Sequence, residues 1–475
     1  MMAKKTKVLL IVPPNSLEER YGKLKFVGAL YPSLGLAAIG AITEKAGFPV
    51  KVIDCEAEGL SYSDLEQKIK EYQPEVIGMQ TFCNTINRAF EIAKRTKKSI
   101  SRDIKIVLGG VQATLFPEKY AENQYVDFIV KGEGEIIFNN LLDALENNSA
   151  DFSHVPGLVW KKEGQIISNQ NEKLITNLDD LPYPARHLFD SSKYYPSAQL
   201  RGKRIVHIIT SRGCPFNCGF CSCHKTFGRS YRFMSTDRVI NEIKYLKEKY
   251  QIDGLNFYDD TFTVNRPRIM ELCDRLIKEK IKLPWICFTR VDCVDPELLK
   301  KMKEAGCYQV FYGVECATQR LLDIISKGFT LERIRQAFKW TKEAGLEVLA
   351  SFIIGLPTET VEEAKKTLDF AIELGCDFAH WEVYTPHPGT NLFEIALQHG
   401  NLLTTDWNKF SPWSDEPVYL PFGRTIEELK STKEWAYRKF YLRPFFILKR
   451  LYGIFKLPPD RIIRLVKSGL TMITK

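Results

Sequence analysis

The stretch Ser211-Arg-Gly-Cys-Pro-Phe-Asn-Cys-Gly-Phe-Cys-Ser-Cys-His224 follows the apolar run 205–209 and holds three thiols, those of Cys214, Cys218 and Cys221. Cysteine thiolates are the usual ligands of iron–sulfur clusters. Three of them on one loop would leave the fourth iron of a 4Fe–4S cluster open to a small molecule. We therefore interpret Cys214, Cys218 and Cys221 as the ligands of such a cluster.

A structural zinc site is the alternative for the same loop, with His224 or Cys223 as the fourth ligand. Zinc modules usually supply their ligands as two separated pairs, and the sequence has no further CxxC or HxxxH pair. The single tight group of thiols therefore favours the cluster. We do not count Cys223 as a cluster ligand, because a thiol two residues after a ligand on a tight loop is expected to point away.

The spacing of three and then two residues between the cysteines, with Phe220 directly before the third, resembles the signature of the radical S-adenosylmethionine superfamily. The resemblance implies that the methionine moiety of S-adenosylmethionine chelates the open iron. It also implies that reductive cleavage gives a 5′-deoxyadenosyl radical, which abstracts hydrogen from an unactivated carbon. The cofactors carry this chemistry, and the protein places them and excludes water.

Length and composition are those of a multidomain soluble protein. A chain of 475 residues exceeds a single core, so two or three domains are expected. The 44% hydrophobic and 26% charged residues are ordinary for soluble proteins, and the 12 scattered cysteines are typical of a reducing cytosol. No run of 18 uncharged apolar residues occurs, so the sequence predicts a cytoplasmic protein without a membrane span.

The net charge of +9 is concentrated at the C-terminal end. Residues 423–475 contain thirteen Lys or Arg and four Asp or Glu, which is also +9, so the rest of the chain is close to neutral. This distribution argues against a general nucleic-acid-binding protein. Aromatic and basic residues alternate in the tail, which suits either peripheral contact with an anionic membrane surface or a helix packed on the protein with its charged face in water. Both interpretations stay open.

Residues 1–150 alternate short apolar runs with amphipathic stretches, which predicts a doubly wound α/β domain with a parallel sheet. The expected strands are 8–12, 50–53, 76–79, 104–108 and 128–130, and the expected helices are 36–44, 62–72, 86–98 and 135–146. Ligands of such sheets bind at the carboxyl ends of the strands.

The strand ends of this domain resemble the cobalamin-binding domain that precedes the catalytic domain in many radical S-adenosylmethionine enzymes. The residues that carry the resemblance, and that it implies as cobalamin contacts, are Thr81, Asn84, Gly109, Gly110, Gly132 and Glu133. The Asp-x-His-x-x-Gly motif that gives cobalt a histidine is missing, and all seven histidines lie outside residues 1–150. If cobalamin binds, this domain supplies no histidine ligand. The alternative is the same fold without the cofactor, because Gly-Gly after a strand is common in α/β sheets.

Residues 151–203 are predicted to be a connector between two domains, with a hairpin formed by 158–161 and 165–168. From residue 204 the alternation resumes as a partial (β/α)6 barrel that ends near residue 395, and residues 396–475 form a cover and the basic tail. The barrel strands are expected at 205–210, 254–258, 285–289, 309–314, 347–354 and 378–384, and the helices at 236–250, 266–279, 296–305, 331–344 and 360–374. Reactive groups of barrels lie beyond the strands' carboxyl ends, where the cysteine loop also falls.

Polar groups or glycines recur at successive barrel strand ends. By resemblance to the superfamily, the contacts to S-adenosylmethionine are Phe220, Asp259, Asp260, Arg290, Glu315, Ile354 and Gly355. Carboxylates suit the ammonium group of the cosubstrate, and an apolar backbone suits adenine. The alternatives are that the two aspartates form an exposed turn and that Glu315 or Arg290 belongs to a buried ion pair.

The sequence is most similar to the subgroup that includes the anaerobic magnesium-protoporphyrin monomethyl ester cyclase and the hopanoid methylases. This implies cobalamin-dependent C-methylation of a hydrophobic metabolite, with an electron donor such as ferredoxin or flavodoxin as partner. A radical oxidoreductase or cyclase without methyl transfer is the second hypothesis, and a non-catalytic metal-stabilised binding protein is the third. Trp407 and Trp413 in the segment 402–422 either line an apolar substrate pocket, for a lipid, isoprenoid or porphyrin, or plug the barrel.

Overall fold

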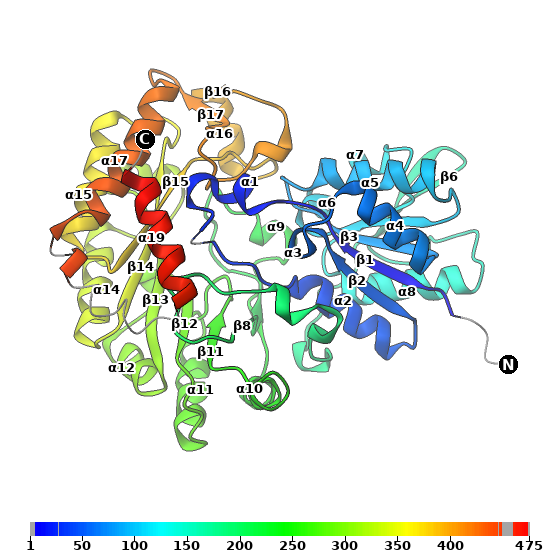
Figure 1. The fold of residues 1–475 in the computed structure, drawn as a ribbon, viewed down its shortest axis with the longest axis horizontal. Helices are drawn as coiled ribbons and strands as arrows, with labels where there is room; N and C mark the ends of the chain where they lie inside the picture. The colour runs from blue at the N-terminus through cyan, green and yellow to red at the C-terminus, as the bar shows by residue number, and fades with distance from the viewer. Residues whose placement is uncertain (1–4, 27, 445, 449–458, 474–475) are drawn as a thin grey trace.

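The computed structural model shows two α/β lobes joined side by side (Figure 1). It describes residues 5–26, 28–444, 446–448 and 459–473. Of the aromatic and basic tail residues considered above, Phe445, Lys449, Arg450, Tyr452, Phe455 and Lys456 lie outside the described residues.

The first lobe is built on a seven-stranded sheet in the order β2-β1-β3-β4-β5-β6-β7. Five strands are parallel, and they are β1 Val8–Val12, β2 Val50–Asp54, β3 Val76–Gln80, β4 Lys105–Gly109 and β5 Phe128–Val130. The helices are α1 Leu17–Tyr21, α2 Leu34–Lys45, α3 Cys55–Glu58, α4 Tyr62–Tyr72, α5 Ile86–Ser99, α6 Val111–Leu115, α7 Pro117–Ala121 and α8 Gly134–Glu146. The predicted doubly wound sheet is confirmed, and most element bounds agree within two residues.

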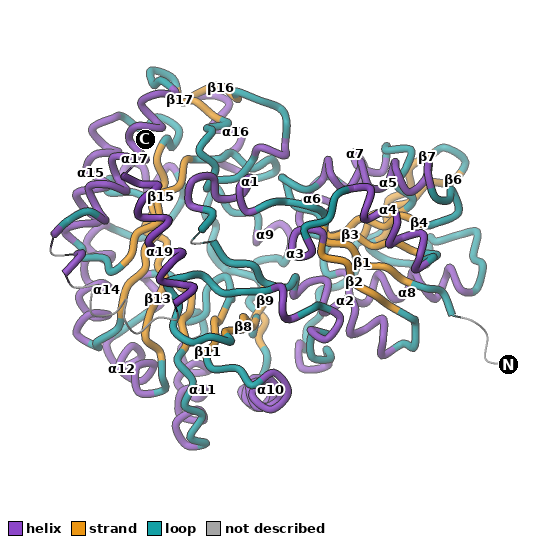
Figure 2. The backbone as a smooth tube through the Cα atoms, viewed as in Figure 1, coloured by secondary structure: helices purple, strands orange, loops and turns teal. Residues whose placement is uncertain are grey.

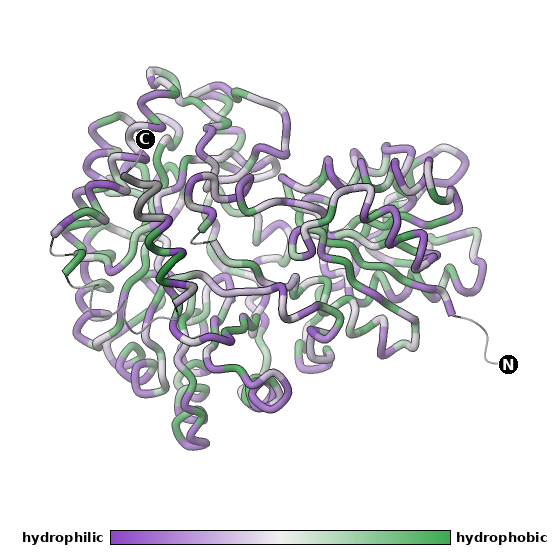
Figure 3. The backbone as a smooth tube through the Cα atoms, in the orientation of Figure 1, coloured by the Kyte–Doolittle hydropathy of each residue, from purple (hydrophilic) through white to green (hydrophobic). Residues whose placement is uncertain are grey.

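Each face of this sheet has its own apolar core. Alternate residues of β1 point to opposite faces, so Leu9 and Ile11 pack with α4 and α5, whereas Val8 and Leu10 pack with α2 and α8. Both faces are thus buried, and β1 and β5 are accordingly apolar throughout; the lobe's strands are mainly hydrophobic in Figure 3.

The predicted hairpin is present but belongs to the first sheet. Strands β6 Leu158–Lys162 and β7 Gln165–Ser168 extend that sheet antiparallel to β5, with Phe128 opposite Trp160. The first lobe therefore continues past the expected boundary at residue 150, and the link between the lobes is shorter than the predicted connector 151–203.

The second lobe contains six parallel strands in the order β15-β14-β13-β12-β11-β8, which is the predicted open barrel (Figure 2). The strands are β8 Ile205–Ile208, β11 Gly254–Phe257, β12 Trp285–Thr289, β13 Cys307–Glu315, β14 Glu347–Ile354 and β15 Phe378–Val383. The helices between them are α10 Thr236–Tyr250, α11 Arg266–Lys278, α12 Pro296–Glu304, α13 Gln319–Ile324, α14 Leu331–Glu343 and α15 Val361–Glu373. The sequence missed the short α13 and also α9 Cys223–Thr226, which follows the cysteine loop.

Helix α17 Ile426–Tyr441 covers the free edge of β15. The hydroxyl of Tyr441 accepts from the N–H of Ala379 at 3.0 Å and donates to its carbonyl at 2.8 Å. Tyr437 makes the same pair of contacts with Trp381, both at 3.3 Å. The edge groups of β15 are thereby satisfied, so for α17 the helix-packed interpretation of the tail is confirmed.

The remaining elements tie the two lobes together. They are α9 Cys223–Thr226, the antiparallel pair β9 Ser211–Arg212 and β10 Arg232–Phe233, α16 Asn391–His399, the pair β16 Gly400–Leu402 and β17 Tyr419–Pro421, and α19 Pro459–Ile473. Trp407 and Phe410 of the cover pack with Cys83 of the first lobe. Among the described residues, the helices include none long and apolar enough to cross a membrane.

Candidate active site

The cysteine loop leaves the carboxyl end of β8 and is held by backbone contacts from distant parts of the second lobe. The N–H of Gly219 donates to Ile325 O at 2.8 Å, and Gly219 O accepts from the N–H of Leu392 at 2.7 Å. The thiols of Cys214, Cys218 and Cys221 are half-buried and free of disulfides. Burial raises the pKa of Cys214 and also that of Cys221, the latter to about 11, so the surroundings of these two favour the neutral thiol until a metal displaces the proton.

Arg290 lies against this loop, as the sequence predicted. Its Nη1 is 3.3 Å from Sγ of Cys218, and its guanidinium carbon lies 3.7 Å from the ring centroid of Phe216. The same side chain pairs with Asp292 and donates to Lys327 O at 2.6 Å. Arg290 therefore forms the ion pair that was the alternative interpretation of this residue, with Asp292 as its partner. Its fixed positive charge faces the place where an anionic cluster would be bound.

The three thiols are not arranged as ligands of one ion. Among the described residues, no three Cys, His, Asp or Glu side chains form a group that could hold a single metal ion. A 4Fe–4S cluster offers each thiolate its own iron, so its ligands need not converge on one point. The arrangement thus gives no support to the zinc alternative, while the cysteine assignment itself stays a prediction.

The two predicted aspartates have different environments. Asp259 is buried, and its Oδ1 accepts from the N–H and hydroxyl of Thr210 at 3.0 Å and from Ser211, while its Oδ2 is buried without a partner. Asp260 is exposed and accepts from Sγ of Cys223 at 2.9 Å. An exposed turn is therefore wrong for Asp259, and Asp260 is the carboxylate free to meet a ligand.

Glu315 forms a buried ion pair that the sequence alternatives anticipated. Its Oε1 lies 2.6 Å from Nζ of Lys327, and both side chains are buried. Glu315 has φ of 73°, at a bulge where β13 pairs with β14. A Cβ at Gly313 would overlap the Glu315 carboxyl and approach Lys327 Nζ to 2.9 Å, so a larger residue there would displace the ion pair. Nζ of Lys327 also lies 5.3 Å from the ring centroid of Phe220.

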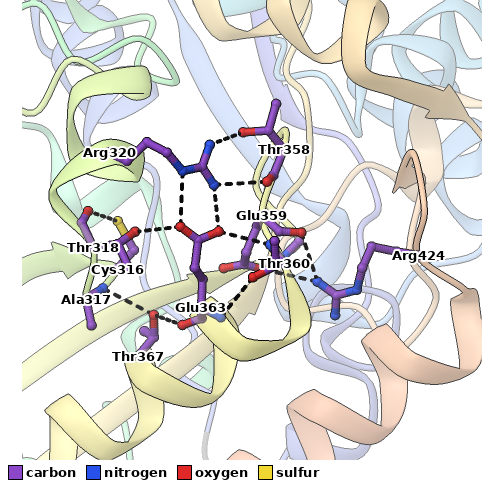
Figure 4. Close-up of polar contacts among 11 residues, drawn as sticks. Cys316, Ala317, Thr318, Arg320, Thr358, Glu359, Thr360, Glu363, Thr367 and Arg424 are labelled. Atoms are coloured by element: carbon purple, nitrogen blue, oxygen red, sulfur yellow. Dashed lines mark hydrogen bonds and ion pairs between the residues drawn. The ribbon is translucent and has the colours of Figure 1, made fainter.

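The strand end predicted to lie beside adenine is held by a buried carboxylate. The N–H of Gly355 donates to Glu359, whose Oε2 lies 3.6 Å from Nη1 of Arg424 (Figure 4). Gly355 has φ of 80°. The side chain of Ile354 is buried in the core of the second lobe, so this residue offers only its backbone to a ligand.

A cavity of about 350 Å³ lies between the two lobes and is lined by residues of both. The first lobe contributes α2 and the ends of β3, β4 and β5, including Gly109, Gly110, Gly132 and Glu133. The second lobe contributes its strand ends, and its lining residues there are Ile209, Ser211, Arg212, Tyr258 and Asp260. Asp260, one of the predicted S-adenosylmethionine contacts, thus lines the same space as the glycines predicted to contact cobalamin. The other predicted S-adenosylmethionine contacts do not line it, and they are Phe220, Asp259, Arg290, Glu315, Ile354 and Gly355.

The lining of this cavity fits a large, flat ligand held by backbone and apolar groups. Gly110 and Gly132 have φ of 90° and 78°, and a Cβ at Gly132 would meet no atom within 4 Å. No histidine is among the described residues that line the cavity. Thr81 and Asn84 are not lining residues either; Thr81 is buried and donates to Gly109 O at 2.9 Å, so it shapes the glycine turn.

Glu133 lines the cavity but is mainly an interlobe ion-pair partner. Its carboxylate accepts from Arg232 Nη1 at 2.8 and 2.9 Å and from Arg212 Nη1 at 3.1 Å. Arg212 also pairs with Glu135. Because Arg212 precedes Cys214 by two residues, this network fixes the start of the cysteine loop on the first lobe.

Sequence reasoning missed Lys327 and the ionic partners Arg212 and Arg232. Lys327 lies in a loop before α14, where a Ser-Lys-Gly turn looks like ordinary surface. The charge of Arg212 beside three cysteines was the one signal in the sequence that could have drawn attention to it.

Two families match the chain, each over one lobe. Residues 208–371 match the family described as the Radical SAM superfamily, and residues 25–142 match the B12 binding domain. The first match begins at the end of β8 and contains the cysteine loop and β9 to β14, and the second contains the strand ends that line the cavity.

Curated relatives cover nearly the whole chain. An uncharacterized methyltransferase of Pyrococcus horikoshii is 36% identical over 94% of this chain and 95% of its own length. The anaerobic magnesium-protoporphyrin IX monomethyl ester cyclase of Rubrivivax gelatinosus is 30% identical over 88% of this chain and 75% of its own length. Among solved structures, the radical S-adenosylmethionine methyltransferase TsrM of Kitasatospora setae, with cobalamin and a 4Fe–4S cluster bound, is similar in fold. Its TM-score is 0.69 at 17% identity, over 93% of this chain and 90% of that one.

Proposed function

Because the chain belongs to the radical SAM superfamily and carries an N-terminal B12-binding domain, we propose that it is a cobalamin-dependent C-methyltransferase acting on a hydrophobic metabolite. The observation that carries the proposal is the interlobe cavity, which the glycine turns of the B12-binding domain and Asp260 beside the cysteine loop both line. Bound there, the 4Fe–4S cluster, S-adenosylmethionine and cobalamin supply reductive cleavage, hydrogen abstraction and a transferable methyl group.

The chain's own residues place these groups and keep water away. Cys214, Cys218 and Cys221 would hold the cluster, with the Arg290 cation next to Cys218. Gly109, Gly110 and Gly132 would hold the corrin ring by backbone contact, without a histidine to cobalt. Asp260 would accept from the ammonium group of the cosubstrate, whereas Glu315 is already paired with Lys327 and would bind through its remaining oxygen.

The stoichiometry of the proposed reaction can be written out. Replacing a substrate C–H by C–CH₃ consumes two S-adenosylmethionine molecules and two electrons. One molecule ends as methionine and 5′-deoxyadenosine, which takes up the substrate hydrogen, and the other ends as S-adenosylhomocysteine. The electrons require an external donor, for which a ferredoxin or flavodoxin is our proposal.

The test is anaerobic reconstitution with iron, sulfide, cobalamin, dithionite and S-adenosylmethionine. Release of both 5′-deoxyadenosine and S-adenosylhomocysteine supports methyl transfer. 5′-Deoxyadenosine alone, with full activity in cobalt-free protein, would contradict it. That outcome favours the second candidate, a radical oxidoreductase or cyclase. The 30% sequence identity to a relative named as a magnesium-protoporphyrin IX monomethyl ester cyclase supports this candidate.

A further inference from the structure

The inner face of the second sheet carries a continuous row of ring side chains. Tyr258, Phe288 and Phe311 follow one another across β11, β12 and β13, with ring centroids 4.8 and 4.7 Å apart. Phe311 lies 6.0 Å from His380 on β15, and His380 packs edge-on against Trp413 of the cover at 4.9 Å. The row thus runs from one side of the open barrel to the other.

This row is only partly covered by other side chains of the described residues. Tyr258 is 51% exposed, and Phe288, Phe311 and His380 are only half-buried. Residues of the same strands that point outward, such as Tyr312, are fully buried against the helices. An accessible aromatic surface in the concavity of a barrel is the usual form of a small-molecule site.

Two polar groups on β15 face the same concavity. Glu382 follows His380 by two residues, so both side chains leave the strand on its inner face. Among the described residues, the Glu382 carboxyl makes no hydrogen bond, and Nδ1 of His380 is buried without a partner. Burial raises the pKa of Glu382 to about 8; the Glu315 carboxylate adds to this shift, and Lys433 opposes it. Glu382 is half-buried, so its carboxyl is partly removed from water and would gain from a ligand that supplies a hydrogen-bond donor.

These groups lie close to the predicted cosubstrate contacts. In the register of the sheet, Gly313 is opposite Ser351, and Ser351 is opposite His380. Oγ of Ser351 lies 3.3 Å from Oε2 of Glu315. A molecule held by His380 and Glu382 would therefore lie beside whatever Glu315 binds.

The cover fixes one wall of this space. The N–H of Val383 donates to Pro412 O at 3.2 Å, and Nζ of Lys433 donates to the carbonyls of Trp413 at 3.0 Å and Ser414 at 2.9 Å. Trp413 is thereby held against His380. Of the two interpretations of this tryptophan, its position supports a pocket-lining role.

We propose that His380 and Glu382 are specificity-determining residues. They select a flat, largely apolar substrate that carries a hydrogen-bond-donating, basic nitrogen. The ring lies against the Tyr258–Phe288–Phe311 row, and the nitrogen donates to Glu382. Aromatic faces favour a cationic N–H group. The positive charge of that group beside Glu382 opposes the effect of burial on its pKa, so the carboxyl is ionised when the ligand is bound and accepts a charge-assisted hydrogen bond. This inference rests on the proposed function, because the molecule concerned is the substrate of the radical reaction.

The test uses two probes with the same indole ring, tryptamine with a protonated amine and indole-3-acetate with a carboxylate. Binding to the anaerobically reconstituted enzyme is measured by ligand-observed NMR. We expect tryptamine to bind at least about tenfold more tightly than indole-3-acetate, and Glu382→Gln to remove most of that difference. Phe311→Ala should weaken both probes alike. The matched control is Glu394→Gln, on the exposed side of α16, which should leave both affinities unchanged.

Equal affinities for the two probes in the wild type would overturn the inference. So would a folded Glu382→Gln variant, with full iron content, that still binds tryptamine like the wild type, or failure of tryptamine to bind at about 5 mM. The proposed function is scored separately. If wild-type enzyme yields no 5′-deoxyadenosine, the proposed reaction fails whatever the probes do; if it cleaves S-adenosylmethionine but the probe results are negative, only the substrate inference fails.

Discussion

Replacing Glu133 with glutamine is expected to loosen the two lobes where the cysteine loop begins. The carboxylate is 3% exposed and takes hydrogen bonds from Arg232, Arg212 and the N–H of Ile175, the last at 2.7 Å. Glutamine removes the charge and leaves Arg232 buried without a counter-ion, while Arg212 keeps Glu135. Removing one partner of a buried ion pair costs about 3–5 kcal/mol. Because one arginine stays paired, we expect about 3 kcal/mol.

Guanidinium unfolding of matched variants measures this cost. Glu135→Gln, which affects only Arg212, should lose less than Glu133→Gln, and Glu122→Gln at an exposed position should lie within about 0.5 kcal/mol of wild type. Limited proteolysis between residues 170 and 203 should accelerate in Glu133→Gln, because the lobes separate more often.

The difference in unfolding free energy between wild type and Glu133→Gln should change with pH in one direction. Burial raises the pKa of Glu133, but the hydrogen bond from Arg232 and the charge of Arg212 outweigh burial and hold it below its ordinary value. The carboxylate therefore stabilises the fold above the ordinary glutamate pKa of about 4.3, and this contribution is lost as the pH falls through the lowered value. The gap between wild type and Glu133→Gln should close in acid. Equal stability of the two proteins at pH 7, together with loss of bound corrinoid in the variant, would refute this reasoning and favour the cobalamin contact predicted from sequence.

Five further variants test the site and the fold. Cys218→Ala should bind markedly less iron and cleave no S-adenosylmethionine, whereas Cys223→Ala should retain its iron; equal iron in both would contradict the ligand assignment. Gly313→Ala should weaken S-adenosylmethionine binding by about tenfold or more without iron loss, because its Cβ displaces Glu315 from Lys327; equilibrium binding checks this. Tyr437→Phe should cost about 1–3 kcal/mol in thermal or guanidinium unfolding, since the edge groups of Trp381 lose their partner. Finally, because burial raises the pKa of Glu382 to about 8, stability should fall between about pH 5 and pH 8 as the unfolded chain releases this proton and the folded one retains it. That fall should be smaller in Glu382→Gln, and parallel curves would count against a buried acid.

The architecture followed from periodicity because the helix-covered strands of both sheets are parallel; only the hairpin β6–β7 is antiparallel within these two sheets. Strands such as β12 and β14 are continuous apolar runs, and their bounds agree with the sequence interpretation residue for residue. Elements set by long-range pairing were predicted less well. The hairpin β6–β7 was found, but the sequence could not show that it pairs with β5, since nothing local records which edge is free.

The candidate site was predictable where a strand end fixes the position. Asp260 and Arg290 lie at the same end of the second sheet as the cysteine loop, as the barrel rule requires. The sequence could not show which carboxylates are already satisfied. Glu133 looked like a ligand contact because it follows a glycine at a strand end, but its arginine partners come from segments about 80 to 100 residues away. Trp413 and His380 are likewise distant in the chain, and only the folding of the chain brings their rings into contact.

Tyr437 and Tyr441 of α17 satisfy the edge groups of β15, and this affects the tendency of the chain to aggregate during synthesis and degradation. Until α17 has emerged and docked, β15 presents unpaired N–H and C=O groups next to an apolar barrel. The nascent or proteolytically shortened chain is then a ready template for strand addition by another copy. We expect fragments ending before residue 425 to form sheet-rich aggregates even though they contain every residue predicted to bind the cluster or S-adenosylmethionine, so α17 protects the full chain against aggregation.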